Sequence, residues 1–143
     1  MTEHPDLTGV SAKDTKDADF YHVRARSKVP VVDLVSKLTE IGVPVEFHRF
    51  IDGGYTHGDF RNAKVPLAEI WQELTELAEK RHPDADNPRE LRARAVARRD
   101  RFLFGLAKGG WEIKDLHEAG LTAEQAVRAG YSARICRLIA DDH

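Results

Sequence analysis

A six-residue pattern occurs twice near the C-terminal end of this chain, ten residues apart. EAGLTA at 118–123 is followed by RAGYSA at 128–133. Each glycine can adopt the left-handed backbone conformation that ends a helix, and each Thr or Ser two residues later can accept hydrogen bonds from the free N–H groups of the next helix. The repeat therefore predicts three short helices, at about 112–119, 123–129 and 133–141.

The second copy of this pattern continues with the residue spacing of a helix-turn-helix. A small residue, Ala126, lies four positions before Gly130, and an apolar residue follows that glycine. Cys136 and Ile139 then occupy the positions that would pack the following helix inward. The stretch 121–139 resembles the helix-turn-helix segments of small bacterial and phage DNA-binding proteins.

The resemblance implies a DNA-reading role for the last segment. The helix after Ser132 would enter the major groove, where Ser132, Arg134 and Arg137 would face bases or phosphates. Arginine suits this role because its planar guanidinium group can bond two acceptors of a guanine at once. The same repeat is also compatible with a three-helix packing unit whose arginines are only solvated, so both interpretations stay open.

Six arginines and two acidic residues lie between Arg89 and Arg101. On a helix, Arg94, Arg98 and Arg101 would share one face because they are spaced at i, i+4 and i+7. Such a stripe could follow a phosphate backbone and would make binding strongly dependent on salt. A charged stripe can equally be a solvated face, or the partner of an acidic protein surface.

Charge is unevenly divided along the 143 residues. Residues 1–86 contain 11 Lys and Arg against 16 Asp and Glu, whereas residues 87–143 contain 11 against 8. The front of the chain is therefore acidic and the rear is basic. This asymmetry favours a rear half that meets an anion and a front half with a different role.

The front half is predicted to be a flexible tail followed by an α+β module. Residues 1–18 are polar and lack apolar periodicity. Residues 19–82 then favour strand, helix, strand, strand and helix, which gives a small antiparallel sheet with helices on one face. The predicted elements begin with a strand at 20–25, a helix at 31–41, a strand at 43–50 with a two-residue period, a returning strand at 55–65 after a turn at 52–54, and a helix opened by Pro66.

The rear half is predicted to be an all-helical module at residues 88–143. A proline-rich break at 82–88 separates it from the front. An Arg-rich helix is expected over 89–108, ended by Gly109-Gly110, and the three short helices follow. The fold class expected for the whole chain is thus α+β, with a helix-turn-helix-like end.

Metal, redox and enzyme chemistry have little support in the sequence. His48, Asp52, His57 and Asp59 lie near the predicted hairpin, but none of their spacings is that of a known metal motif. The single cysteine, Cys136, excludes an internal disulfide and fits a buried small hydrophobe. Phosphate-loop and nucleophile-elbow motifs do not occur. We therefore expect no cofactor, no metal and no catalytic residue.

These observations predict a non-enzymatic DNA-binding regulatory or accessory protein. The rear helices would contact double-stranded DNA, and residues 19–82 would mediate a homodimer or bind a protein partner. A cytoplasmic location is expected because no apolar run approaches the roughly 20 residues that cross a bilayer. The Ala- and Arg-rich rear half resembles proteins of high-GC actinobacteria or their phages in composition.

Two other functions remain open from the sequence. In the first, the chain is a protein-interaction module, such as an adaptor, an inhibitor or a phage structural or accessory component, with no nucleic-acid binding. In the second, it is a small metal-dependent enzyme, which would require His22, His48 and His57 to converge in a cleft.

Overall fold

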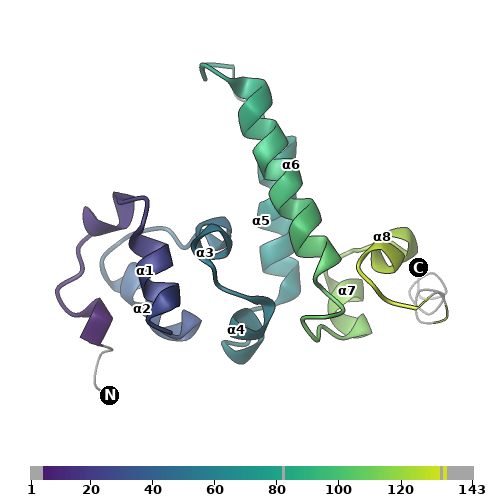
Figure 1. The fold of residues 1–143 in the computed structure, drawn as a ribbon, viewed down its shortest axis with the longest axis horizontal. Helices are drawn as coiled ribbons and strands as arrows, with labels where there is room; N and C mark the ends of the chain where they lie inside the picture. Colours follow the sequence, from purple (N-terminus) through teal and green to yellow (C-terminus); the bar gives the residue numbers. More distant parts are fainter. Residues whose placement is uncertain (1–4, 82, 133, 135–143) are drawn as a thin grey trace. The chain divides into compact units, whose positions relative to one another are not determined.

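All regular structure in the described part of the chain is helical (Figure 1). The computed structural model describes residues 5–81, 83–132 and 134, and these ranges contain no strand. The prediction of an α+β fold with a small antiparallel sheet is therefore wrong. The chain divides into two compact units, an N-terminal unit at Met1–Lys64 and a C-terminal unit at Val65–His143.

The N-terminal unit is a set of short helices around an aromatic cluster. Its core includes Phe50 and Phe60, both without exposed surface, together with Phe20, Tyr21 and Tyr55. Residues 5–18, expected to belong to a flexible tail, bury Leu7, Val10 and Thr15. In chain order the elements are the 3-10 helices η1 (Pro5–Leu7) and η2 (Asp14–Lys16), then α1 (Phe20–Arg26), α2 (Val31–Glu40), α3 (Phe47–Gly53) and α4 (His57–Asn62).

The first predicted strand is helix α1. Its side chains interact at the four-residue spacing of a helix, because the guanidinium carbon of Arg24 lies 4.1 Å from the centroid of the Phe20 ring. Arg24 also donates a hydrogen bond of 3.3 Å to the carbonyl of Asp6. Phe20 and Tyr21 are buried whereas His22 and Val23 are exposed, which is the pattern of a helical turn and not of an alternating strand.

The predicted hairpin at 43–65 is the helix pair α3 and α4. Phe47 and Phe50 are three residues apart, so on a helix they lie close enough for their rings to meet at 5.9 Å. Thr56 and Asp59 form a capping box that starts α4, with the Thr56 amide donating to the Asp59 carboxylate at 2.8 Å. The expected turn at 52–54 is the end of α3, where Gly54 has a φ of 112°.

Helices α1 and α3 approach each other closely at Gly53. A Cβ atom at this position would lie 2.8 Å from the backbone carbonyl carbon of Tyr21 and 2.9 Å from the backbone nitrogen of His22. The His22 ring nitrogen Nδ1 lies 3.2 Å from the Gly53 carbonyl oxygen at the same crossing. Only a residue without a side chain fits here.

In the C-terminal unit, the helix predicted after Pro66 and the short helices predicted at 112–119 and 123–129 are confirmed. The Arg-rich helix, expected over 89–108 with its end at Gly109-Gly110, ends earlier, at Phe104, where Gly105 follows as its C-cap. The helix after Pro66 packs against the Arg-rich helix. The break at 82–88 was expected to separate two modules, but it connects these two packed helices within the C-terminal unit. The described part of the expected third short helix is confined to Arg134. The elements are α5 (Leu67–Glu79), α6 (Pro88–Phe104), α7 (Ile113–Glu118) and α8 (Ala123–Arg128).

Most of these helices end in one type of junction. A residue in the left-handed conformation is followed by an apolar residue whose N–H bonds the carbonyl five positions earlier, which closes the free end of the helix. The repeat at residues 118–133 predicted this conformation for Gly120 and Gly130, and φ values of 76° and 99° confirm it. The closing N–H groups belong to Val29, Val43, Tyr55, Leu121 and Tyr131, and the Trp111 N–H closes the turn after α6 in the same way, by bonding the Leu106 carbonyl.

Two left-handed positions of the chain hold lysine in place of glycine. Lys28 and Lys64 have φ values of 59° and 58°. They occupy equivalent places in two similar segments, SKVPVVDLVSKLTEI at 27–41 and AKVPLAEIWQELTEL at 63–77. Each segment begins α2 or α5 directly after its proline. None of the helices in the described ranges has the length and apolar character needed to cross a bilayer.

Candidate functional site

The outward face of α6 is strongly basic, with exposed arginines at 89, 92, 94 and 101. α6 packs on α5 through buried Ala95, Phe102 and Leu103. Its first seven residues, 88–94, are all exposed, and the exposed surface continues on one side through Ala97 to Phe104. Small alanines between the arginines let a partner approach the helix backbone closely. This face carries much of the positive charge of residues 87–143.

The structure separates the three arginines that were predicted to share this face. Arg94 and Arg101 are exposed, and Arg94 forms an ion pair with Glu90 one turn earlier. Arg98 is half-buried and already interacts within the protein. Its neighbour Arg99 lies over Trp71 of α5, with the guanidinium carbon 6.0 Å from the ring centroid. Two of the three predicted residues are therefore exposed, and Arg94 would share its charge between Glu90 and a partner.

Two further residues at the end of this face were not predicted from the sequence. Phe104, the last residue of α6, is 52% exposed, and Val127 of α8 is 51% exposed. The guanidinium carbon of Arg128 lies 5.5 Å from the centroid of the Phe104 ring. The sequence signal was weak because Phe104 and Arg128 come from different helices. A phenylalanine three residues after the last arginine of the Arg-rich stretch could have suggested the site.

The segment that leaves α8 is held against the loop that follows α6. The Ala107 N–H donates a 3.2 Å hydrogen bond to the Ala129 carbonyl, and the Tyr131 hydroxyl donates to the Trp111 carbonyl. These bonds fix where the chain emerges toward Ser132, which is exposed, as is Arg134. The predicted contact residue Arg137 lies outside the described residues.

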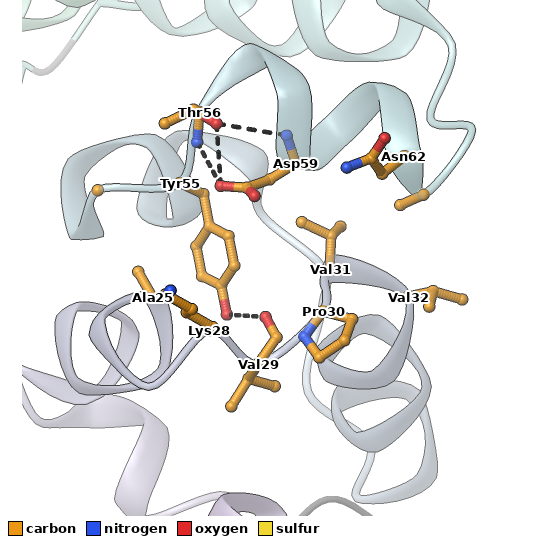
Figure 2. Close-up of a pocket in the computed structure, with 12 residues that line it drawn as sticks. Ala25, Lys28, Val29, Pro30, Val31, Val32, Tyr55, Thr56, Asp59 and Asn62 are labelled. Atoms are coloured by element: carbon orange, nitrogen blue, oxygen red, sulfur yellow. Dashed lines mark hydrogen bonds between the residues drawn. The ribbon is translucent and has the colours of Figure 1, made fainter.

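An open groove of about 560 Å³ lies on the N-terminal unit (Figure 2). One wall is α4 with Asp59 and Asn62, and the opposite wall is the start of α2 with Pro30, Val31 and Val32. The Asp59 carboxylate accepts from the Thr56 amide and hydroxyl, so the bonds drawn there hold the first turn of α4. Neither wall carries an arrangement of acid, base and nucleophile.

Tyr55 joins the two sides of this groove. Its hydroxyl donates a 2.8 Å hydrogen bond to the Val29 carbonyl, in a buried environment (Figure 2). Burial, together with the neighbouring Asp59 carboxylate, raises the pKa of Tyr55, so the phenol stays protonated and able to donate. The bond therefore ties the start of α4 to the junction between α1 and α2.

We expect Tyr55→Phe to destabilise the protein by about 1–2 kcal/mol, because it removes the donor that satisfies a buried carbonyl. Urea denaturation followed by circular dichroism would measure the loss. Val32→Ala is a suitable control, since Val32 lines the same groove but is 53% exposed. Equal stability of Tyr55→Phe and the wild type would contradict the assigned role.

The histidines that could have formed a metal centre lie on three separate helices. His22 meets the Gly53 carbonyl, and His48 Nε2 lies 3.6 Å from a Glu46 carboxylate oxygen. His57 is the first residue of α4. In the ranges described, no group of three or more His, Cys, Asp or Glu side chains is placed to hold a metal ion.

Comparison with known proteins adds no relative. No family model, curated protein or solved structure matches the chain significantly.

Proposed function

We propose that this protein binds DNA through its C-terminal unit, as a non-enzymatic regulatory or accessory protein. The observation that carries the proposal is the exposed face of α6, where Arg94 and Arg101 stand two turns apart with alanine between them. Two helical turns advance about 10 Å, a distance similar to three base steps along a DNA strand. Both guanidinium groups can then contact one phosphate backbone.

The rest of the unit supplies the second part of the proposed interface. The helix-turn-helix-like segment places Ser132 and Arg134 on the surface after α8, and Arg137 belongs to the same segment. In the proposed complex α6 follows the backbone while the residues from Ser132 onward enter the major groove. Phosphate contacts by α6 set the position, and the groove contacts supply sequence preference.

A homodimer is part of this proposal. A single short recognition segment gives few base contacts, and two copies related by a two-fold axis would double them on adjacent half-sites. The N-terminal unit, which lacks a comparable arginine stripe, is proposed to provide the protein contacts. Sedimentation of the complex with a palindromic duplex would report the number of chains bound.

We expect Arg94→Ala/Arg101→Ala to weaken binding to duplex DNA at low salt by about tenfold or more, because two charge-assisted contacts are lost. The slope of log affinity against log salt should fall by about 2, one for each phosphate contact. Fluorescence anisotropy with a labelled mixed-sequence duplex across a salt series measures both quantities. Arg134→Ala/Arg137→Ala tests the proposed groove segment in the same assay.

A matched control distinguishes a local contact from net charge. Arg26→Ala/Arg61→Ala removes the same two charges from the N-terminal unit and should leave the affinity nearly unchanged. Absence of binding at low salt, or an equal loss in both double variants, would contradict the proposal. The alternative would then be the protein-interaction module, in which the Arg-rich helix meets an acidic protein surface.

A further inference from the structure

Phe104 is the most unusual residue on the proposed DNA-binding surface. The other five phenylalanines of the chain are buried or half-buried, whereas half of this side chain is in contact with solvent. Its ring adjoins Arg128 of α8, and Arg101 lies one turn earlier on the same side of α6. An exposed aromatic ring thus stands among exposed cations that come from two helices.

This combination suits a nucleobase better than an apolar protein surface. A base can stack on the open part of the Phe104 ring or on the planar guanidinium group of Arg128. The adjoining phosphate carries the negative charge that Arg101 attracts, and an apolar protein patch would leave both arginines without a counterion. The bases of a continuous duplex are already stacked on one another, so the base must be unpaired.

We infer that Phe104 and Arg128 form a stacking site for an unpaired DNA base, with Arg101 contacting the neighbouring phosphate. The inference rests on the proposed DNA binding and makes it more specific. The preferred ligand is a duplex with an adjoining single-stranded segment: α6 follows the duplex backbone, and the first unpaired base stacks at the end of the helix. An intact blunt duplex uses only the backbone contacts.

The test compares two labelled probes by anisotropy: a blunt duplex, and the same duplex with a short thymidine overhang at its 3′ or 5′ end. We expect the wild-type protein to bind one overhang probe about tenfold more tightly than the blunt probe, as one stacked base contributes. Phe104→Leu keeps an apolar side chain but loses the ring, so the preference for the overhang probe over the blunt probe should disappear. Phe104→Trp should retain the preference.

The controls separate this inference from the proposed function. Val127→Ala removes an apolar side chain of similar exposure next to Arg128 and should keep the overhang preference. Equal wild-type affinity for blunt and overhang probes would overturn the stacking site and leave DNA binding in place. A preference that survives Phe104→Leu would also overturn it. Failure to bind any probe would instead remove the proposed function itself.

Discussion

Replacing Phe50 by alanine is expected to destabilise the N-terminal unit by about 3–5 kcal/mol, which is the usual cost of removing a fully buried aromatic side chain. Phe50 has no exposed surface, and its ring meets those of Tyr21, Phe47, Tyr55 and Phe60 at centroid distances of 5.2–6.3 Å. The substitution would leave a cavity lined by these rings. Urea denaturation followed by far-ultraviolet circular dichroism would report the loss.

The chain offers a control with the same chemical change. Phe104→Ala removes an equal side chain from a position that is 52% exposed, so we expect an effect on stability below about 1 kcal/mol. Both tryptophans, Trp71 and Trp111, lie in the C-terminal unit, so their fluorescence follows that unit while circular dichroism follows the whole chain. Similar losses for the two variants would contradict the aromatic core described for the N-terminal unit.

Gly53→Ala is expected to have the second largest effect, a destabilisation near the upper end of the roughly 1–3 kcal/mol that overpacking costs. The added methyl group would press on the backbone of α1 at Tyr21 and His22, which is less able to shift than a flexible side chain. Helices α1 and α3 would have to separate, and the contact between His22 and the Gly53 carbonyl would lengthen. Chemical denaturation would give the change in unfolding free energy.

Gly58→Ala provides the matched control for Gly53→Ala. Gly58 lies within α4, and a Cβ atom there would meet only the Thr56 hydroxyl, at an ordinary 3.7 Å. Alanine is the better helix former by about 0.5–1 kcal/mol, so this variant should be as stable as the wild type or more stable. A comparable loss of stability in both glycine variants would show that the close crossing of α1 and α3 is not the cause.

The long helices could be predicted from their apolar spacing, and the short helices α7 and α8 from the repeated glycine pattern. The short helices of the N-terminal unit could not. α2, α5 and α6 each present apolar side chains over ten or more residues, and prolines stand at or before their first turns. α1, α3 and α4 have only six or seven residues, too few for a period of 3.6 to be distinguished from a period of 2. Their aromatic and β-branched residues then favoured strands.

Local signals for the short helices were nevertheless present. Thr56 and Asp59 have the spacing of a capping box, and the same box occurs at Thr122 and Gln125, where the start of a helix was predicted correctly. Gly53, Gly54 and Tyr55, which directly precede Thr56, led instead to the prediction of a hairpin. The distinction depended on tertiary packing, since Phe47 and Phe60 meet in the core across the turn between α3 and α4.

The arginine stripe shows how far a site can be predicted from spacing alone. The i, i+4, i+7 rule placed Arg94, Arg98 and Arg101 together, but packing of α6 on α5 half-buries Arg98. Arg128 reaches Phe104 from another helix, a contact that no periodicity within one segment encodes. Sequence therefore identified the helix that carries the charge, and tertiary structure decided which of its side chains a partner can meet.

The helix junctions have a consequence for how this chain can change length during evolution. Each junction satisfies the end of its helix with an N–H group from its own turn. Outside the helices and turns of the described ranges, one backbone hydrogen bond joins segments that are distant in sequence. The Ala107 N–H donates it to the Ala129 carbonyl. Insertion or deletion of a whole helix with its junction would thus leave few backbone N–H and C=O groups without a hydrogen bond. Only the packing of apolar side chains between the neighbouring helices would need to change. The similar segments at 27–41 and 63–77 are what such a history of internal copying would produce.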